Sequence, residues 1–434
     1  MTQTEDERHM RILFVTTPLS TIFYPMVPLA WALRTAGHDV RVASYPNFAD
    51  TITQAGLTAV PVGRDRNMLQ LLPGQTEELL EEARRGLPRP YDIAEDPEGT
   101  DWEEALEGYY EALYSWHRLE NFPLVAGLVE FARQWKPDLV LWEPMAFAGA
   151  IAAKACGAAH GRLLWTMDVF GVARERFLEL REQQPEGERV DPLGEWLEGY
   201  ARKYGFEFSE DLVTGQFTVD QFPRAWGMRA RELEYVPMRY VPYGGPAVVP
   251  RWLRERPERS RVAVSMGVAA ISQFSGYPVD LREVLEGVAD LDVEVVATVP
   301  EAEQEKMAPL PDNVRMVPYV PLADLAATCD AVVNHAGLGT MMAMGLYGVP
   351  QVALPWDFEA PELARRAAEY GSTLALSPEK ADAATVREAV RRVLDEPSFR
   401  ERAADLREQI ISSKSPTEAV SDLEAFTERH RSDR

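Results

Sequence analysis

The amino-acid sequence predicts an α/β protein of two domains, each an open parallel sheet covered by helices, that face each other across a cleft. Three observations lead to this fold class. The chain has 434 residues, too many for one ordinary hydrophobic core and suited to two domains of about 200 residues. Short apolar runs of strand type alternate with segments of helical periodicity in both halves. Between the halves, residues 237–250 hold four prolines and the pair Gly244-Gly245, which resist helices and central strands and predict a linker.

The N-terminal half begins with a strand–helix–strand unit. Residues 11–16 form an apolar run of strand type, residues 26–34 carry apolar side chains at helical spacing, and residues 39–45 form a second strand. Such a unit makes a parallel pair of strands with a right-handed crossover. Residues 138–143 and 162–165 repeat the strand pattern and are expected to extend the same sheet.

The pattern restarts after the linker. Strands are expected at 261–266, 293–298, 314–319, 331–334 and 351–355, and helices at 281–289, 322–328, 384–394 and 398–412. The chain is therefore divided into an N-terminal domain (1–236), the linker (237–250), a C-terminal domain (251–412) and a last segment (413–434). We expect this last segment to pack back toward the N-terminal domain as a helix or tail. Open parallel sheets bind ligands at the carboxyl ends of their strands, so the cleft between the domains is the expected site.

The composition excludes several classes of partner. The formal net charge is −24, which repels nucleic acids and anionic membranes. No apolar run reaches the roughly 20 residues that span a bilayer, and the polar start of the chain is unlike a signal peptide. Cys156 and Cys329 have no metal-type or redox-type neighbours and are interpreted as small packed residues. These features favour a cytoplasmic protein.

The densest chemical signal follows the strand at 331–334. His335, Gly337 and Gly339 form a polar loop, and a helix-forming run begins at Thr340. Thr340 is expected to cap that helix, whose free N–H groups would point at an anion, while the glycines allow close approach of oxygen atoms. The pattern indicates a diphosphate site with His335 as a donor. The alternative is a tight strand-to-helix turn with a structural histidine.

A second candidate for phosphate contact closes an earlier strand of the same half. Ser265 and Gly267 place a small hydroxyl and a glycine at a strand's carboxyl end. On its own this is a weak signal, but it gains weight from sharing a domain with His335.

With these residues the chain resembles the two-domain glycosyltransferases of the GT-B type, built on two Rossmann-like domains, that decorate bacterial macrolides, anthracyclines and related polyketides. It looks most like the activator-dependent branch that includes the desosaminyltransferases. The resemblance covers essentially the whole chain and runs through VPLAWA (27–32), AGLTAVPVG (55–63), PDLVLWEP (137–144), MRYV (238–241), PDNVR (311–315) and GVPQV (348–352). It implies a nucleotide-sugar donor, usually a TDP-deoxysugar, a natural-product aglycone as acceptor, no cofactor or metal, and a cytochrome-P450-like activator protein. A homodimer is left open.

The resemblance also assigns the donor site by position. The family's diphosphate loop falls on residues 335–340, with Ala336 in place of the first glycine. The backbone that reads the base falls near Tyr319 and Val320. The acidic–Gln pair that grips the sugar falls on Glu359 and Ala360, so one amide is missing. A donor with fewer hydroxyls, or with an amino group for Glu359 to contact, would tolerate that loss.

The first loop of the chain departs from the family at the catalytic base. Ile22 occupies the position of the histidine that deprotonates the acceptor, and isoleucine cannot take a proton. Glu143, at a strand end beside the expected acceptor cleft, is the favoured replacement because burial raises a carboxyl pKa toward a useful value. Asp168 is a second candidate. Either acid has a structural alternative, such as pairing with an arginine.

Further residues are expected to line the acceptor pocket: Ile22, Phe23, Tyr24 and Trp142. The aromatic segment 102–122 is expected either to line this pocket or to dock an activator. Three functions therefore remain open. These are inverting transfer to oxygen with an atypical base, transfer to nitrogen or carbon by the same fold, and a non-catalytic sugar-nucleotide-binding or assembly subunit.

Overall fold

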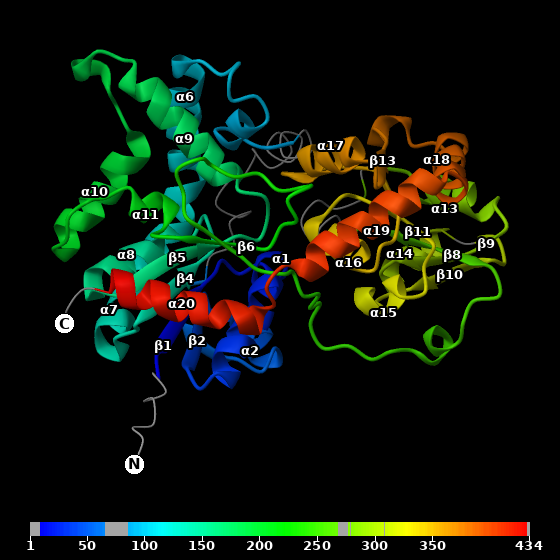
Figure 1. The fold of residues 1–434 in the computed structure, drawn as a ribbon, viewed down its shortest axis with the longest axis horizontal. Helices are drawn as coiled ribbons and strands as arrows, with labels where there is room; N and C mark the ends of the chain where they lie inside the picture. Colours follow the sequence, from blue (N-terminus) through cyan, green and yellow to red (C-terminus); the bar gives the residue numbers. More distant parts are fainter. Residues whose placement is uncertain (1–8, 66–85, 268–276, 278, 308, 432–434) are drawn as a thin grey trace.

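The computed structural model describes residues 9–65, 86–267, 277, 279–307 and 309–431. Within these residues the chain forms two wholly parallel sheets, one of seven strands in the order β3-β2-β1-β4-β5-β6-β7 and one of six in the order β10-β9-β8-β11-β12-β13. The two sheets lie side by side along the long axis of the molecule, each flanked by helices (Figure 1). The expected fold class is confirmed.

The strands are short and mostly buried on both faces, as the strands of parallel sheets are. The first sheet contains β1 (Arg11–Val15), β2 (Asp39–Ser44), β3 (Thr58–Pro61), β4 (Leu139–Trp142), β5 (Ala159–Leu163), β6 (Thr218–Asp220) and β7 (Tyr235–Pro237). The second contains β8 (Ser260–Ser265), β9 (Val293–Thr298), β10 (Val314–Val317), β11 (Ala331–Asn334), β12 (Gln351–Ala353) and β13 (Thr373–Ala375).

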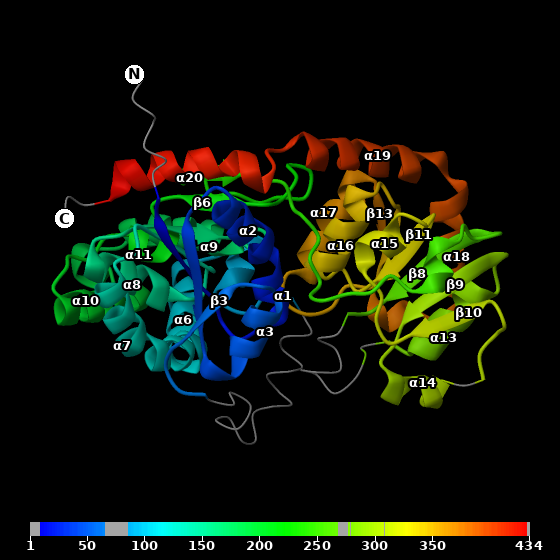
Figure 2. The ribbon, with the colours of Figure 1, turned by 90° about the horizontal axis from the view of Figure 1, so that it is seen from below.

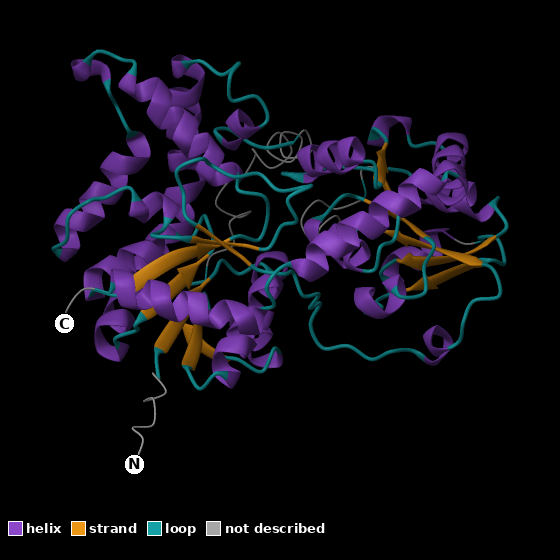
Figure 3. Ribbon diagram, viewed as in Figure 1, coloured by secondary structure: helices purple, strands orange, loops and turns teal. Residues whose placement is uncertain are grey.

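The described helices surround these sheets (Figure 3). In the N-terminal domain they are α1 (Ser20–Phe23), α2 (Val27–Thr35), α3 (Ala49–Gln54), α6 (Trp102–Ala112), the π-helical turn η4 (Leu113–His117), α7 (Arg118–Trp135), α8 (Phe147–Cys156), α9 (Val169–Glu182), α10 (Pro192–Tyr204) and α11 (Asp211–Thr214). The later part of the chain contains α13 (Leu281–Ala289), α14 (Glu301–Met307), α15 (Leu322–Ala326), α16 (Leu338–Leu346), α17 (Ala360–Tyr370), α18 (Ala383–Asp395), α19 (Pro397–Ser412) and α20 (Pro416–His430).

The sequence misplaced one strand and missed four. The strand expected at 162–165 is β5, three residues earlier, because His160 and Arg162 look polar but are buried and paired inside the domain. The missed strands β3, β6, β7 and β13 lie at or near sheet edges and are three or four residues long. Such short segments carry little apolar periodicity, so a pattern search does not separate them from loops.

The strand register pairs the chain segments that follow four strands, two in each sheet. In the first sheet β1 pairs with β4, so that Val15 lies beside Trp142 and the loops after both strands are neighbours. The Glu143 N–H donates to Val15 O at 3.2 Å. In the second sheet β8 pairs with β11, Ser265 lying beside Asn334, so the loops leading to Gly267 and His335 are neighbours too.

The chain passes between the domains twice, along one side of the molecule. The first sheet ends with β7, so Pro237 still belongs to a strand and the linker begins one residue later than expected. Helices α19 and α20 run one after the other across both domains (Figure 2). The Arg239 N–H donates to Lys414 O at 2.6 Å, which ties the two crossings together. Helix α20 lies on the N-terminal domain, where the Phe426 ring is 4.7 Å from Phe217.

Candidate functional site

The loop after β11 is shaped by a buried asparagine. Asn334 Oδ1 accepts a hydrogen bond from the Ala336 N–H at 2.7 Å, and its Nδ2 donates to Gln351 Oε1 at 2.8 Å. The following helix α16 begins at Leu338 with Gly337 as its N-cap. The expectation that Thr340 caps this helix is therefore wrong: Thr340 is its third residue and its N–H donates to Gly337 O at 3.1 Å. The helix start lies nearer His335 than expected, and its first N–H groups remain available to an anion.

The imidazole of His335 is enclosed by two glycines. A Cβ atom at Gly267 or at Gly337 would overlap the ring, so both positions require the absence of a side chain. Gly267 also has a φ of +74°, in the left-handed region that glycine favours. Burial lowers the pKa of His335 to about 4, against an opposing effect of the Ser265 backbone. The ring is therefore neutral at pH 7 and donates one N–H at most.

Ala336, which replaces the glycine of the resembled loop, has a φ of +61°. This is the left-handed conformation, in which a Cβ atom costs about 1 kcal/mol or more. The alanine therefore holds a left-handed backbone under strain. A glycine would adopt this conformation without strain, which agrees with the glycine that the resembled family has at this position.

The other predicted donor residues surround this loop in different ways. The Ser265 hydroxyl is buried and accepts a hydrogen bond from Thr298 at 3.0 Å. Gly339 is exposed at the start of α16. The Tyr319 side chain is 48% exposed and its hydroxyl donates to Gly244 O of the linker at 3.1 Å. The Val320 side chain is in the core, so only its backbone could contact a nucleotide base.

The predicted sugar residues belong to a strained loop that reaches the N-terminal domain. Asp357 and Phe358 have φ values of +74° and +44°, and Glu359 and Ala360 follow at the start of α17, both buried. Burial raises the pKa of Glu359 to about 8, helped by the charge of Asp357 and opposed by a hydrogen bond from Thr166 of the N-terminal domain. Burial also raises the pKa of Asp357 to about 7.

Glu143 stands at the end of β4, fully buried. Its Oε2 accepts hydrogen bonds from the Met145 N–H at 2.9 Å and from the Trp165 indole N–H at 3.2 Å. Its Oε1 has no hydrogen-bond partner among the described residues. Burial raises the pKa of Glu143 to about 7, although these hydrogen bonds and Thr17 favour the charged form. A half-ionised carboxyl with a free oxygen has the properties of a general base.

Asp168, the second candidate base, is a structural residue. Both of its oxygens accept hydrogen bonds from the Arg162 guanidinium, at 3.0 and 2.7 Å. It also accepts from the Tyr235 hydroxyl at 2.6 Å and caps α9 through the Gly171 N–H at 2.8 Å. The carboxylate is fully buried and its lone pairs are engaged, so it is not placed to take a substrate proton.

Three of the four predicted pocket residues are core residues. Trp142 is fully buried, with its indole N–H against His160, and Phe23 packs edge-to-face on Phe48. Ile22 is 3% exposed and belongs to the core cluster that also contains Trp142, although its backbone lies in the expected first loop. Tyr24 is partly exposed and its ring lies 5.4 Å from that of Tyr243 in the linker.

Sequence reasoning also missed residues beside Glu143. Burial raises the pKa of Glu120 on α7 to about 8, and the charge of Glu143 adds to this. The Trp165 indole N–H donates a hydrogen bond to Glu143. The Trp165 ring also contacts the Phe358 ring of the second domain, with centroids 5.5 Å apart. The signal that could have found Trp165 is its position two residues after β5, on the carboxyl side of the sheet. Phe358 gave no such signal, because its contact crosses between domains.

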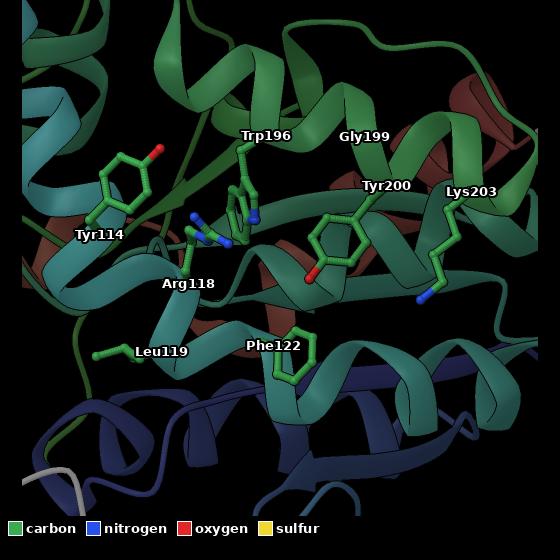
Figure 4. A pocket seen from close by; sticks show the side chains of 8 residues that line it. All are labelled: Tyr114, Arg118, Leu119, Phe122, Trp196, Gly199, Tyr200 and Lys203. Carbon is green, nitrogen blue, oxygen red and sulfur yellow. The ribbon is translucent and has the colours of Figure 1, made fainter. Parts of the chain in front are cut away.

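One surface groove is separate from the residues described above. A groove of about 510 Å³ lies between α7 and α10 on the N-terminal domain, and none of the predicted site residues lines it (Figure 4). Its walls include Tyr114 and Phe122 of the aromatic segment 102–122, which are 60% and 65% exposed.

The described residues contain no cluster of three His, Cys, Asp or Glu side chains that could hold a metal ion. In the same part of the chain, every helix is too short or too polar to cross a bilayer.

The fold and the loop at His335 define a class of protein. The structure is similar to glycosyltransferase VinC in complex with DTDP, with a TM-score of 0.85 and 36% identity over 97% of this chain and all of that one. It is also similar to the spinosyn forosaminyltransferase SpnP, with a TM-score of 0.81 and 38% identity over the same shares. The protein is a glycosyltransferase of the GT-B fold.

The sequence then gives the family. Two family models match: Erythromycin biosynthesis protein CIII-like, N-terminal domain, over residues 31–267, and the C-terminal domain of the same family over residues 282–426. The chain is 43% identical to 10-deoxymethynolide desosaminyltransferase of Streptomyces venezuelae, covering 97% of this chain and 98% of that protein. It is 40% identical to aclacinomycin-T 2-deoxy-L-fucose transferase of Streptomyces galilaeus, covering 98% of both. The chain belongs to the erythromycin biosynthesis protein CIII-like family of glycosyltransferases.

Proposed function

We propose that the protein transfers a deoxysugar from a TDP-sugar to a polyketide-type or aromatic acceptor, with inversion at the anomeric carbon and Glu143 as the base. The observation that carries this proposal is the buried Glu143 carboxyl, with one oxygen unpartnered and its pKa raised to about 7. The donor is inferred from relatives named as desosaminyl and 2-deoxy-L-fucose transferases and from the DTDP complex of VinC.

In this mechanism Glu143 Oε1 takes the proton of the acceptor's nucleophilic atom. That atom forms a bond to the anomeric carbon while the bond from this carbon to the diphosphate oxygen breaks, and the electron pair leaves with TDP. The first N–H groups of α16 and the His335 imidazole stabilise the growing negative charge. Because a bound diphosphate raises the pKa of a neighbouring imidazole, donor binding also favours the charged form of His335.

The sugar is inferred from Glu359 and Ala360. Since the pKa of Glu359 is about 8, its carboxyl is mostly protonated at pH 7 and can donate a hydrogen bond to a sugar oxygen. Ala360 offers no amide, which favours a deoxysugar, with an amino group as a further option. Competition among TDP-glucose, TDP-dideoxy sugars and TDP-aminosugars tests this inference, and preference for TDP-glucose would contradict it.

The experiment that tests the whole proposal is an assay of the purified protein with TDP-deoxysugars and a panel of macrolactone and anthracyclinone aglycones. Each reaction is run with and without a cytochrome-P450-like activator, which is part of the proposal. Mass spectrometry and NMR of the product give the attached atom and the anomeric configuration. Tight TDP binding without turnover in every arm would favour a non-catalytic subunit, and a product linked through carbon or nitrogen would replace oxygen transfer.

A further inference from the structure

One aromatic side chain connects the proposed base to the proposed sugar loop. The Trp165 indole N–H donates to Glu143 Oε2 at 3.2 Å. The same indole ring lies 5.5 Å from the Phe358 ring, at 38° between planes. Trp165 belongs to the N-terminal domain, whereas Phe358 directly precedes Glu359 in the C-terminal domain. The path from Glu359 to Glu143 therefore runs through two packed rings and one hydrogen bond.

The N-terminal end of this path is rigidly held. The Leu164 N–H donates to Val219 O at 3.0 Å, and the Leu164 carbonyl accepts from the Gln221 amide at 3.1 Å. Three residues beyond Trp165, Asp168 is held by the Arg162 guanidinium. The backbone on both sides of Trp165 is thus pinned to the first sheet, so the indole can respond mainly by rotating its side chain.

The C-terminal end of the path is strained. Asp357 and Phe358 both have positive φ values, a conformation that side chains with a Cβ atom rarely adopt. Phe358 is held by aromatic neighbours of the N-terminal domain, with ring centroids 6.1 Å from Trp116 and 6.4 Å from Phe170. Backbone strain of this kind persists only where the surrounding structure holds it, and the aromatic rings around Phe358 are such surroundings. A sugar bound at Glu359 acts on the residue next to this strained pair.

We propose that Trp165 is a positioning residue, which orients the Glu143 carboxylate through its indole N–H. A change in the donor loop at Phe358 would shift the Trp165 ring across the domain boundary and so change the orientation of this carboxylate. The inference rests on the proposed function in taking Glu143 as the base. The response of the Trp165 indole to the bound donor and to the charge of Glu143 can nevertheless be measured without turnover. The other titratable groups facing the Glu143 carboxyl are Glu120 of α7 and the Tyr91 phenol, and both stay in place in the variants below.

Two variants separate the two halves of the link. Trp165→Phe keeps an aromatic ring against Phe358 and removes the indole N–H. Phe358→Leu keeps the N–H and removes the ring contact. Trp31→Phe is the matched control, because the Trp31 indole N–H also donates a hydrogen bond, to Ala55 O at 3.0 Å, but on α2, outside the cleft.

The first measurement is made without acceptor and so without turnover, by following the indole ¹H–¹⁵N resonances of the ten tryptophans as a function of pH and of added TDP-sugar. The Trp165 resonance, assigned by its loss in Trp165→Phe, is expected to titrate with a midpoint near pH 7, to stop doing so in Glu143→Gln, and to shift on TDP-sugar binding. In Phe358→Leu the pH titration should remain while the TDP-sugar shift weakens. A Trp165 resonance that ignores both pH and the bound donor would overturn the inference.

The second measurement is the pH profile of kcat/KM. A donated hydrogen bond favours the charged carboxylate, so Trp165→Phe should move the acid limb upward by about one pH unit and lower kcat by about tenfold at pH 7. Phe358→Leu should lower kcat more than it raises the donor KM, and the double variant should lose little beyond Trp165→Phe alone. An unmoved acid limb in Trp165→Phe contradicts the positioning role. Full activity of Glu143→Gln instead contradicts the proposed function, which keeps the two failures apart.

Discussion

The two terminal nitrogens of Arg162 hold the two carboxylate oxygens of Asp168 at 3.0 and 2.7 Å, inside the first domain. Both side chains are almost completely buried, at 1% and 0% exposure. This pair separates the two acids that the sequence placed at the acceptor cleft. Asp168 is engaged by arginine, a tyrosine hydroxyl and a helix N-terminus, whereas Glu143 keeps one free oxygen.

We predict that Asp168→Asn destabilises the protein by about 3–5 kcal/mol, because it leaves the buried Arg162 charge unpaired. The protein that remains folded should show the same pH dependence of kcat/KM as the parent. Urea unfolding and a kcat/KM profile measure the two effects. Asp422→Asn, in the exposed ion pair with Lys414, is the control and should cost about 1 kcal/mol or less. A stable Asp168→Asn protein without activity would return Asp168 to the list of candidate bases.

Glu143→Gln is expected to reduce kcat by about 10²-fold or more, because glutamine cannot accept the acceptor's proton. Its amide oxygen can still accept the hydrogen bonds from Met145 and Trp165, so the loop should keep its shape. TDP affinity, measured by calorimetry, should therefore stay within about twofold. Glu130→Gln, on the exposed side of α7, is the matched control. Loss of TDP binding together with activity would indicate a structural role for Glu143 instead.

His335→Ala is expected to lower turnover by about 10²-fold and to weaken TDP binding, because one donor to the leaving diphosphate is removed. The thermal unfolding midpoint should fall only modestly, since the imidazole loses one backbone hydrogen bond, with Ser265, and its Nδ1 has no partner among the described residues. The measurement pairs calorimetric titration of TDP with a melting curve. A large drop in the midpoint with unchanged TDP affinity would make His335 a structural residue of the turn.

Ala336→Gly should raise the free energy of unfolding by between zero and about 1 kcal/mol. Glycine relieves the left-handed strain at φ +61° but also adds freedom to the unfolded chain, and the two effects partly cancel. Ala327→Gly is the matched control, because Ala327 is exposed with a φ of −60° and gains nothing from glycine. That control should lose about 0.5–1 kcal/mol. Equal losses in both variants would show that Ala336 is not strained.

The stability of the protein should fall as the pH rises from about 4.5 to 7 and level off above that. Burial raises the pKa of Glu143 from its ordinary 4.5 to about 7. A raised carboxyl pKa favours the folded state fully below pH 4.5, and this contribution is lost as the pH rises through 7. Glu143→Gln, which cannot ionise, should therefore match the parent at pH 4 and exceed its free energy of unfolding at pH 8.5, by up to about 3 kcal/mol. Chemical unfolding at the two pH values measures the difference, and a gap that does not grow with pH would contradict it.

The sequence alone determined the two parallel-sheet domains, because β1, β9, β11 and α13 carry apolar periodicity that does not depend on distant residues. It also determined that a polar, glycine-rich loop follows β11, and the resemblance supplied the class of enzyme. Only the tertiary structure showed that Glu143 and Asp168 have different environments, that α16 begins at Leu338, and that Phe23 and Trp142 are buried in the core. It alone brought Phe358 to Trp165. The physical reason is that charge pairing, burial and contacts between domains depend on atoms far apart in the chain, which no local pattern encodes.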